Sequence, residues 1–116
     1  MTTTELMIGN WVLDTRTNKP LRVNPFMSEL EVPTWQPIPI TQSILETNGF
    51  KKTYCSQNYK WLSHGGHTIT IDLEDKCIVI NFGYLKLVYT AFSDYIPLHY
   101  LQNYITLCGI KKEIIL

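Results

Sequence analysis

The last third of the chain alternates apolar and polar residues, and this pattern constrains the fold most strongly. Residues 67–72, 76–82 and 84–91 are separated by short turns, which predicts three strands of an antiparallel meander. Strands of this kind have one face in water and one that a helix or second sheet must cover. We expect that cover to be a helix beginning near Pro97. Its apolar face is made by Leu98, Leu101, Ile105 and Cys108.

The first forty residues predict a second, smaller β unit. Residues 6–14 and 21–23 flank a polar turn, which predicts a hairpin of SH3-like appearance, and a further short strand is expected around residues 30–32. Prolines at 33, 37 and 39 exclude a central strand, because proline has no backbone N–H to donate. We therefore expect an extended, edge-like connector that inserts three side chains into the core. These are Trp35, Ile38 and Ile40.

Three further elements complete the predicted architecture. Residues 41–48 predict a short connector helix with Thr41 as its N-cap and Asn48-Gly49 as a left-handed C-cap. A strand is expected within residues 52–62, ahead of the meander. Residues 113–116 predict a terminal strand whose edge could pair with another chain. The fold class is thus α+β: a β-hairpin region, a connector helix and a meander covered by a C-terminal helix.

Composition favours one compact domain. Hydrophobic residues make up 45% of the 116 and charged residues 17%, so we expect a single domain over residues 1–116, with a candidate subdomain boundary near residue 40. Ten basic and ten acidic residues cancel, whereas proteins that grip nucleic acid are usually basic. The chain has no apolar run of membrane-spanning length and no secretory signal at its start, which predicts a cytoplasmic protein with no membrane partner.

The chain contains the cysteines and histidines that a nucleophilic or metal site uses, but no complete sequence motif for such a site. Three scattered cysteines are expected to be inert thiols, so no catalytic residue is predicted. His64 and His67 flank two glycines and could converge on a metal ion. A catalytic site would also need Cys55 or Asp72 as a third ligand, so a metal-dependent hydrolase is the second alternative function. We favour a solvated glycine turn and expect no cofactor.

One predicted strand interleaves aromatic residues with lysines. Such a strand could stack bases and hold the phosphates of single-stranded nucleic acid, although the same pattern is common in half-buried strands. The residues concerned are Lys51, Lys52, Tyr54, Tyr59, Lys60 and Trp61.

The C-terminal helix also carries a polar face. His99 and Asn103 are four residues apart, and Gln102 lies beside them, offset from the apolar stripe. These side chains could bind a partner, or they could hydrogen-bond a neighbouring strand of the same chain.

Three stretches of the chain, residues 5–12, 36–50 and 98–109, resemble a family of small uncharacterised proteins of Bacteroides-type gut bacteria and their phages or mobile elements. That family has a similar R-I-G-N-W-V start, a P-I-P-L-T middle and an H-x-L-Q-N-L-Y helix. The chain departs from the pattern at Met7, where the family commonly has a basic residue, and at residues 104–108, where the helix end is shorter. The resemblance implies a bacterial or phage cytoplasmic protein and supplies no activity.

These observations favour a non-enzymatic protein-interaction module of phage or mobile-element origin, which would bind a protein partner or another copy of itself. The alternative is a protein that binds single-stranded nucleic acid.

Overall fold

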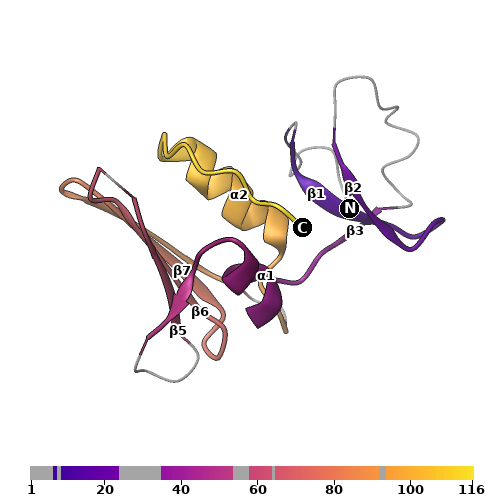
Figure 1. The fold of residues 1–116 in the computed structure, drawn as a ribbon, viewed down its shortest axis with the longest axis horizontal. Helices are drawn as coiled ribbons and strands as arrows, with labels where there is room; N and C mark the ends of the chain where they lie inside the picture. Colours follow the sequence, from indigo (N-terminus) through magenta and orange to yellow (C-terminus); the bar gives the residue numbers. More distant parts are fainter. Residues whose placement is uncertain (1–6, 8, 24–34, 54–57, 64, 92–93) are drawn as a thin grey trace.

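The computed structural model describes residues 7, 9–23, 35–53, 58–63, 65–91 and 94–116. They form a three-stranded and a five-stranded antiparallel sheet with two helices, which confirms the α+β fold class. The longer helix lies between the two sheets, as Figure 1 shows.

The smaller sheet has the strand order β2-β1-β3. β1 spans Trp11–Asp14, β2 spans Lys19–Arg22 and β3 spans Trp35–Pro37. The predicted hairpin is confirmed as β1 and β2, with shorter strands. The two prolines of this sheet, Pro20 and Pro37, lie in its edge strands β2 and β3, where a missing N–H costs no central ladder bond. The strand expected at residues 30–32 falls outside the described residues, and the SH3-like appearance stays a prediction.

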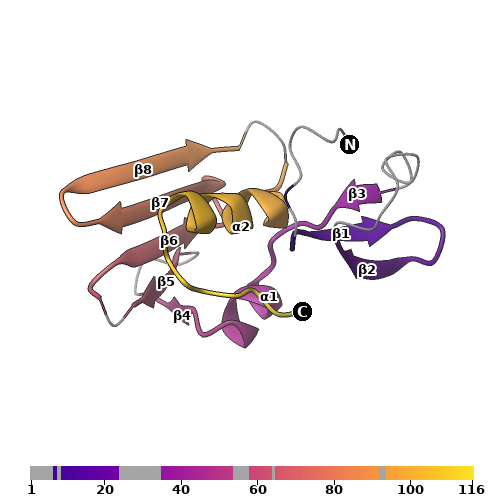
Figure 2. The same ribbon diagram turned by 90° about the horizontal axis from the view of Figure 1, so that it is seen from above.

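The larger sheet is the predicted meander, in the order β4-β5-β6-β7-β8 (Figure 2). In place of one strand over residues 52–62, the structure has β4 at Lys51–Lys52 and β5 at Asn58–Leu62, paired antiparallel. β6 spans Thr68–Asp72, β7 spans Cys77–Phe82 and β8 spans Leu85–Thr90.

The inner face of this sheet supplies most of the core. Ile69, Ile71, Ile78 and Ile80 are fully buried, and burying a side chain of this size is worth about 1.5–3 kcal/mol. The helix α2, Leu98–Leu107, lies over them with Leu98, Leu101 and Ile105 buried, as predicted, whereas Cys108 is only half-buried.

The connector helix α1 spans Gln42–Thr47 and begins as predicted. The Oγ1 of Thr41 accepts a hydrogen bond from the N–H of Ile44 at 3.3 Å, and Leu45 is buried. Gly49 has a φ of 84°, the left-handed conformation that ends a helix without steric cost.

The segment that links the sheets runs beside the start of α2. Ile40 donates its N–H to the carbonyl of Ile96 at 2.9 Å, and Leu98 donates to the carbonyl of Ile38 at 2.7 Å. Pro39 and Pro97 stand opposite each other between these bonds. Their neighbours thus supply the N–H donors that the prolines lack.

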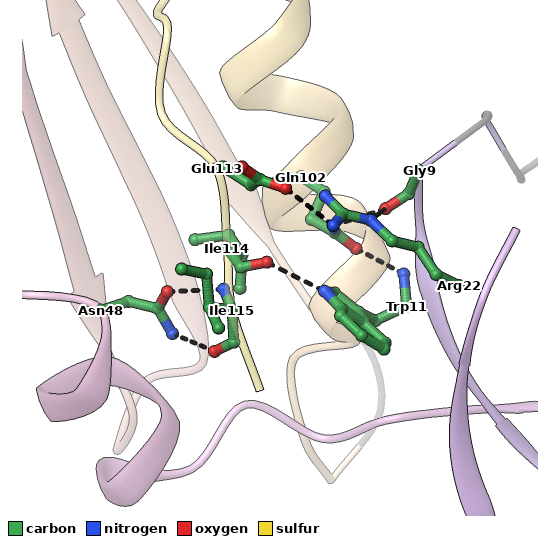
Figure 3. A network of polar contacts seen from close by, with 8 residues as sticks. All are labelled: Gly9, Trp11, Arg22, Asn48, Gln102, Glu113, Ile114 and Ile115. Carbon is green, nitrogen blue, oxygen red and sulfur yellow. Dashed lines mark hydrogen bonds and ion pairs between the residues drawn. The ribbon is translucent and has the colours of Figure 1, made fainter.

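The prediction of a strand at residues 113–116 is wrong, because this segment is not part of either sheet. Side chains satisfy its backbone instead (Figure 3). The indole N–H of Trp11 donates to the carbonyl of Ile114 at 2.9 Å. The amide of Asn48 accepts from the N–H of Ile115 at 2.7 Å and donates to its carbonyl at 2.8 Å. Ile110 and Ile114 enter the core.

We expect Asn48→Ala to lower the free energy of unfolding by about 1–3 kcal/mol, because it removes two partly buried hydrogen bonds between the Asn48 amide and the backbone of Ile115. Chemical denaturation would measure the change. Asn81→Ala, at an exposed position on β7, is the matched control and should change stability by less than about 0.5 kcal/mol. Equal midpoints for the two variants would contradict the role given to Asn48.

Candidate functional site

The polar face of α2 holds the smaller sheet. Gln102 accepts a hydrogen bond from the N–H of Trp11 at 2.8 Å through Oε1 and donates to the carbonyl of Gly9 at 3.0 Å through Nε2. Asn103 accepts from the side-chain amide of Asn10 at 2.8 Å. Of the two interpretations of this face, hydrogen bonding to a neighbouring strand is therefore the one that the structure shows for Gln102.

The third residue of that face, His99, is 1% exposed. Its ring centroid lies 4.6 Å from that of Tyr100, so the imidazole is packed inside the molecule. All three predicted residues therefore make their described contacts within the chain.

The two candidate metal ligands are only partly described. His64 and Cys55 lie outside the described residues, and the backbone N–H of His67 donates to the Oγ of Ser63 at 2.9 Å. Asp72 caps the β6–β7 turn by accepting the N–H groups of Glu74 and Asp75, each at 2.9 Å. Within the described ranges, no three His, Cys, Asp or Glu side chains group as a metal site would require.

The two described cysteines are poorly suited to nucleophilic attack. Burial raises the pKa of both Cys77 and Cys108, and the carboxylates of Asp72 and Asp75 raise the pKa of Cys77 further. A thiol of raised pKa is mostly protonated at neutral pH, and the protonated form is a weak nucleophile.

The predicted strand that interleaves lysines with aromatic residues has a buried part and an exposed part. Tyr59 does not fit a stacking role, because its ring faces the core and is fully buried, and Tyr54 lies outside the described residues. Burial raises the pKa of Tyr59, and the nearby carboxylate of Glu46 adds to the shift. Sequence alternation places Tyr59 and Trp61 on the same face of β5 and could not tell which of the two is fully buried.

The exposed part surrounds a hollow of about 500 Å³ at the β4–β5 hairpin. Lys51 and Lys60 stand directly opposite each other and are exposed. The ammonium of Lys112 lies 4.8 Å from the ring centroid of Trp61 and donates to the carbonyl of Asn48 at 2.7 Å, and burial lowers its pKa. The hollow is lined by Gly49, Lys51, Lys52, Thr53, Lys60, Trp61 and Leu62.

A second hollow, of about 460 Å³, lies between the smaller sheet and the C-terminal segment. Much of its polar lining is already bonded within the chain: Arg22 pairs with Glu113 at 2.7 Å and donates to the carbonyl of Gly9 at 3.3 Å, and Gln102 bonds that same carbonyl (Figure 3). The residues that line this hollow therefore serve to hold the smaller sheet in place.

The opposite edge of the large sheet is the strand β8. Among the described strands, β8 pairs only with β7. Leu85 and Val88 are 64% and 56% exposed, and Tyr84, just before the strand, is fully exposed. The sequence of β8 carries apolar residues on both faces of the strand. This pattern is the sequence feature from which an exposed apolar surface at this edge could have been predicted.

The hydrogen-bond pattern fixes which backbone groups of β8 point away from β7. The N–H of Ala91 donates to the carbonyl of Lys76 at 2.8 Å, next to the Cys77–Thr90 pair. Because successive residues of an antiparallel strand bond to opposite sides, alternate residues of β8 bond to β7 and the others point outward. The outward residues are Lys86, Val88 and Thr90.

We expect Tyr59→Phe to leave the protein at least as stable at neutral pH, because the buried hydroxyl has no hydrogen-bond partner among the described residues. A tyrosine whose pKa is raised in the folded state loses its stabilising effect as pH rises above about 10, where the unfolded chain ionises first. The midpoint of alkaline unfolding should therefore move to higher pH.

Circular dichroism along a pH titration measures this shift. Tyr84→Phe, at a fully exposed tyrosine, is the control and should leave the midpoint unchanged. A loss of stability above about 1 kcal/mol in Tyr59→Phe would instead show that the hydroxyl is bonded.

None of the helices in the described part of the chain is both long and apolar enough to cross a membrane. Comparison of the chain with protein-family models, curated proteins and solved structures finds no match.

Proposed function

We propose that this protein is a non-enzymatic protein-interaction module, that its binding element is the free edge of β8, and that the partner is a second copy of the chain. The observation that carries the proposal is a six-residue edge strand with outward backbone groups and exposed apolar side chains. Such an edge is a template for pairing with another strand. The binding edge is thus proposed at β8, and not at residues 113–116, where the sequence predicted a strand.

The geometry of β8 selects one register for pairing with itself. Opposite residues of an antiparallel pair share a face, and the hydrogen-bonded ones must both have outward backbone groups. Twofold axes at neighbouring residues also meet both conditions, but only an axis at Val88 pairs all three outward residues: it sets Val88 opposite its copy and Lys86 opposite the partner's Thr90. All three outward residues then exchange backbone hydrogen bonds, and the two five-stranded sheets become one continuous sheet.

The side chains suit this register. Lys86 faces a threonine, so no like charges meet, and Leu87 faces the partner's Tyr89 on the inner side. Tyr89 is held at this edge by α2, since its ring centroid lies 5.3 Å from those of Tyr100 and Tyr104. Because a single strand pair buries little area, the dimer should be weak and depend on protein concentration.

The resemblance to proteins of gut bacteria and their phages would place such a dimer in the cytoplasm of a bacterium, in the service of a phage or mobile element. A small scaffold that doubles its surface by self-pairing is consistent with that setting, and it requires no cofactor and no catalytic residue.

We expect Val88→Pro to abolish dimer formation without unfolding the chain. Proline removes an N–H that points away from β7, so the β7–β8 ladder keeps its bonds while the edge loses its central donor. Sedimentation equilibrium over a range of protein concentrations would give the dimer dissociation constant. Val88→Thr keeps the N–H and should retain most of the association, whereas a monomeric wild-type protein at every concentration would refute the proposal.

We also expect Val88→Cys to form a disulfide between two copies under mild oxidation. Cα atoms of a hydrogen-bonded pair lie about 5.5 Å apart, within the range that a disulfide spans. Lys86→Cys is the matched control, because two copies of residue 86 would be four strand positions apart and roughly 13 Å from each other. Mass spectrometry of the linked peptides would identify the register, and equal cross-linking at both positions would contradict it.

A further inference from the structure

Three lysines of the β4–β5 hairpin surround one hollow, and no acidic side chain is among its described lining residues. Lys51 and Lys60 are a cross-strand pair of like charge, and Lys52 follows directly. Like charges placed opposite each other on a sheet destabilise it. The described ion pairs are Arg16–Asp14 and Arg22–Glu113, so none of these three lysines is neutralised by a described residue.

The cluster is a local departure from a neutral chain. The formal net charge is zero, yet the exposed acidic residues Glu74 and Asp75 sit at the β6–β7 turn, and Asp72 is paired with Asn58 at the end of β5 that is remote from Leu62. Glu46 also lies near β5, where its carboxylate raises the pKa of the buried Tyr59, but it does not line the hollow. An arrangement of like charges that costs stability in the free protein would gain from a bound anion.

The indole of Trp61 forms one wall of this hollow, and a fourth lysine packs against that indole. Trp61 is half-buried and lines the hollow, and Lys112 approaches its ring from the C-terminal segment. Lys112 is itself anchored by its hydrogen bond to Asn48, so this wall is fixed by the same residue that holds the C-terminal segment. The hollow therefore combines exposed cations with one side that is anchored by these contacts.

We propose that this hollow binds the phosphate groups of a chain-like anion, with Lys51, Lys52 and Lys60 as its cationic contacts. Ammonium groups bind phosphate oxygens as point charges and carry no base specificity. The same chemistry is offered by a strand of nucleic acid and by free polyphosphate. This site lies at the edge of the sheet opposite β8, so it is independent of self-pairing.

The test uses the full chain and two probes at low ionic strength: inorganic tripolyphosphate and a labelled oligothymidylate of about 12 nucleotides. Calorimetry follows the first and fluorescence anisotropy the second. We expect binding that weakens with salt, and about tenfold weaker binding in the double variant Lys51→Gln/Lys60→Gln. For the oligonucleotide, the slope of log K against log salt should fall by about 1.4, since each single-strand phosphate contact contributes about 0.7.

The control is Lys19→Gln/Lys111→Gln, which removes the same charge from two exposed lysines that do not line the hollow. Circular dichroism would show that both double variants are folded. Oligonucleotide binding well above tripolyphosphate binding identifies a nucleic-acid strand as the ligand, and comparable binding identifies the phosphate chain alone. Failure of both probes to bind, or equal losses in the two double variants, would overturn the proposal.

Discussion

The side-chain amide of Gln102 is the contact on which the arrangement of the two sheets depends. α2 buries Leu98, Leu101 and Ile105 against the large sheet, which leaves the opposite side of the helix facing the smaller one. That side is polar, so it can meet a strand only if each buried polar group finds a partner. Gln102 meets this condition by accepting from one backbone N–H of the N-terminal segment and donating to one of its carbonyls.

The same device recurs at Asn48, whose amide pairs with the backbone of Ile115 much as a neighbouring strand would. Amide side chains carry both a donor and an acceptor, so they can replace a strand where none is available. The molecule thus uses glutamine and asparagine to join segments that do not share a sheet. As a result, the polar residues that looked most like binding residues in the sequence are largely engaged in holding the fold.

Local periodicity was sufficient to predict the meander, both helices and the N-terminal hairpin. Each depends on alternation, helical spacing or a cap, and these signals lie within a few residues of one another. The C-terminal segment was predicted wrongly because its partners, Trp11 and Asn48, are far away in the sequence and bond through side chains. Tyr59 and Trp61 have the same parity along β5, yet only Tyr59 is fully buried, because exposure also depends on the distance from the sheet edge and on which loops cover it.

The contacts of the smaller sheet also have a consequence for folding. Trp11 reaches Gln102 and Ile114 across separations of 91 and 103 residues, whereas the meander is built from hairpins between neighbouring strands. Closing such long loops costs chain entropy before any contact repays it, so the meander should form first and the N-terminal sheet should dock onto it late. The two sheets would then be early and late folding units, and the N-terminal sheet would be the first to detach when the native protein opens locally.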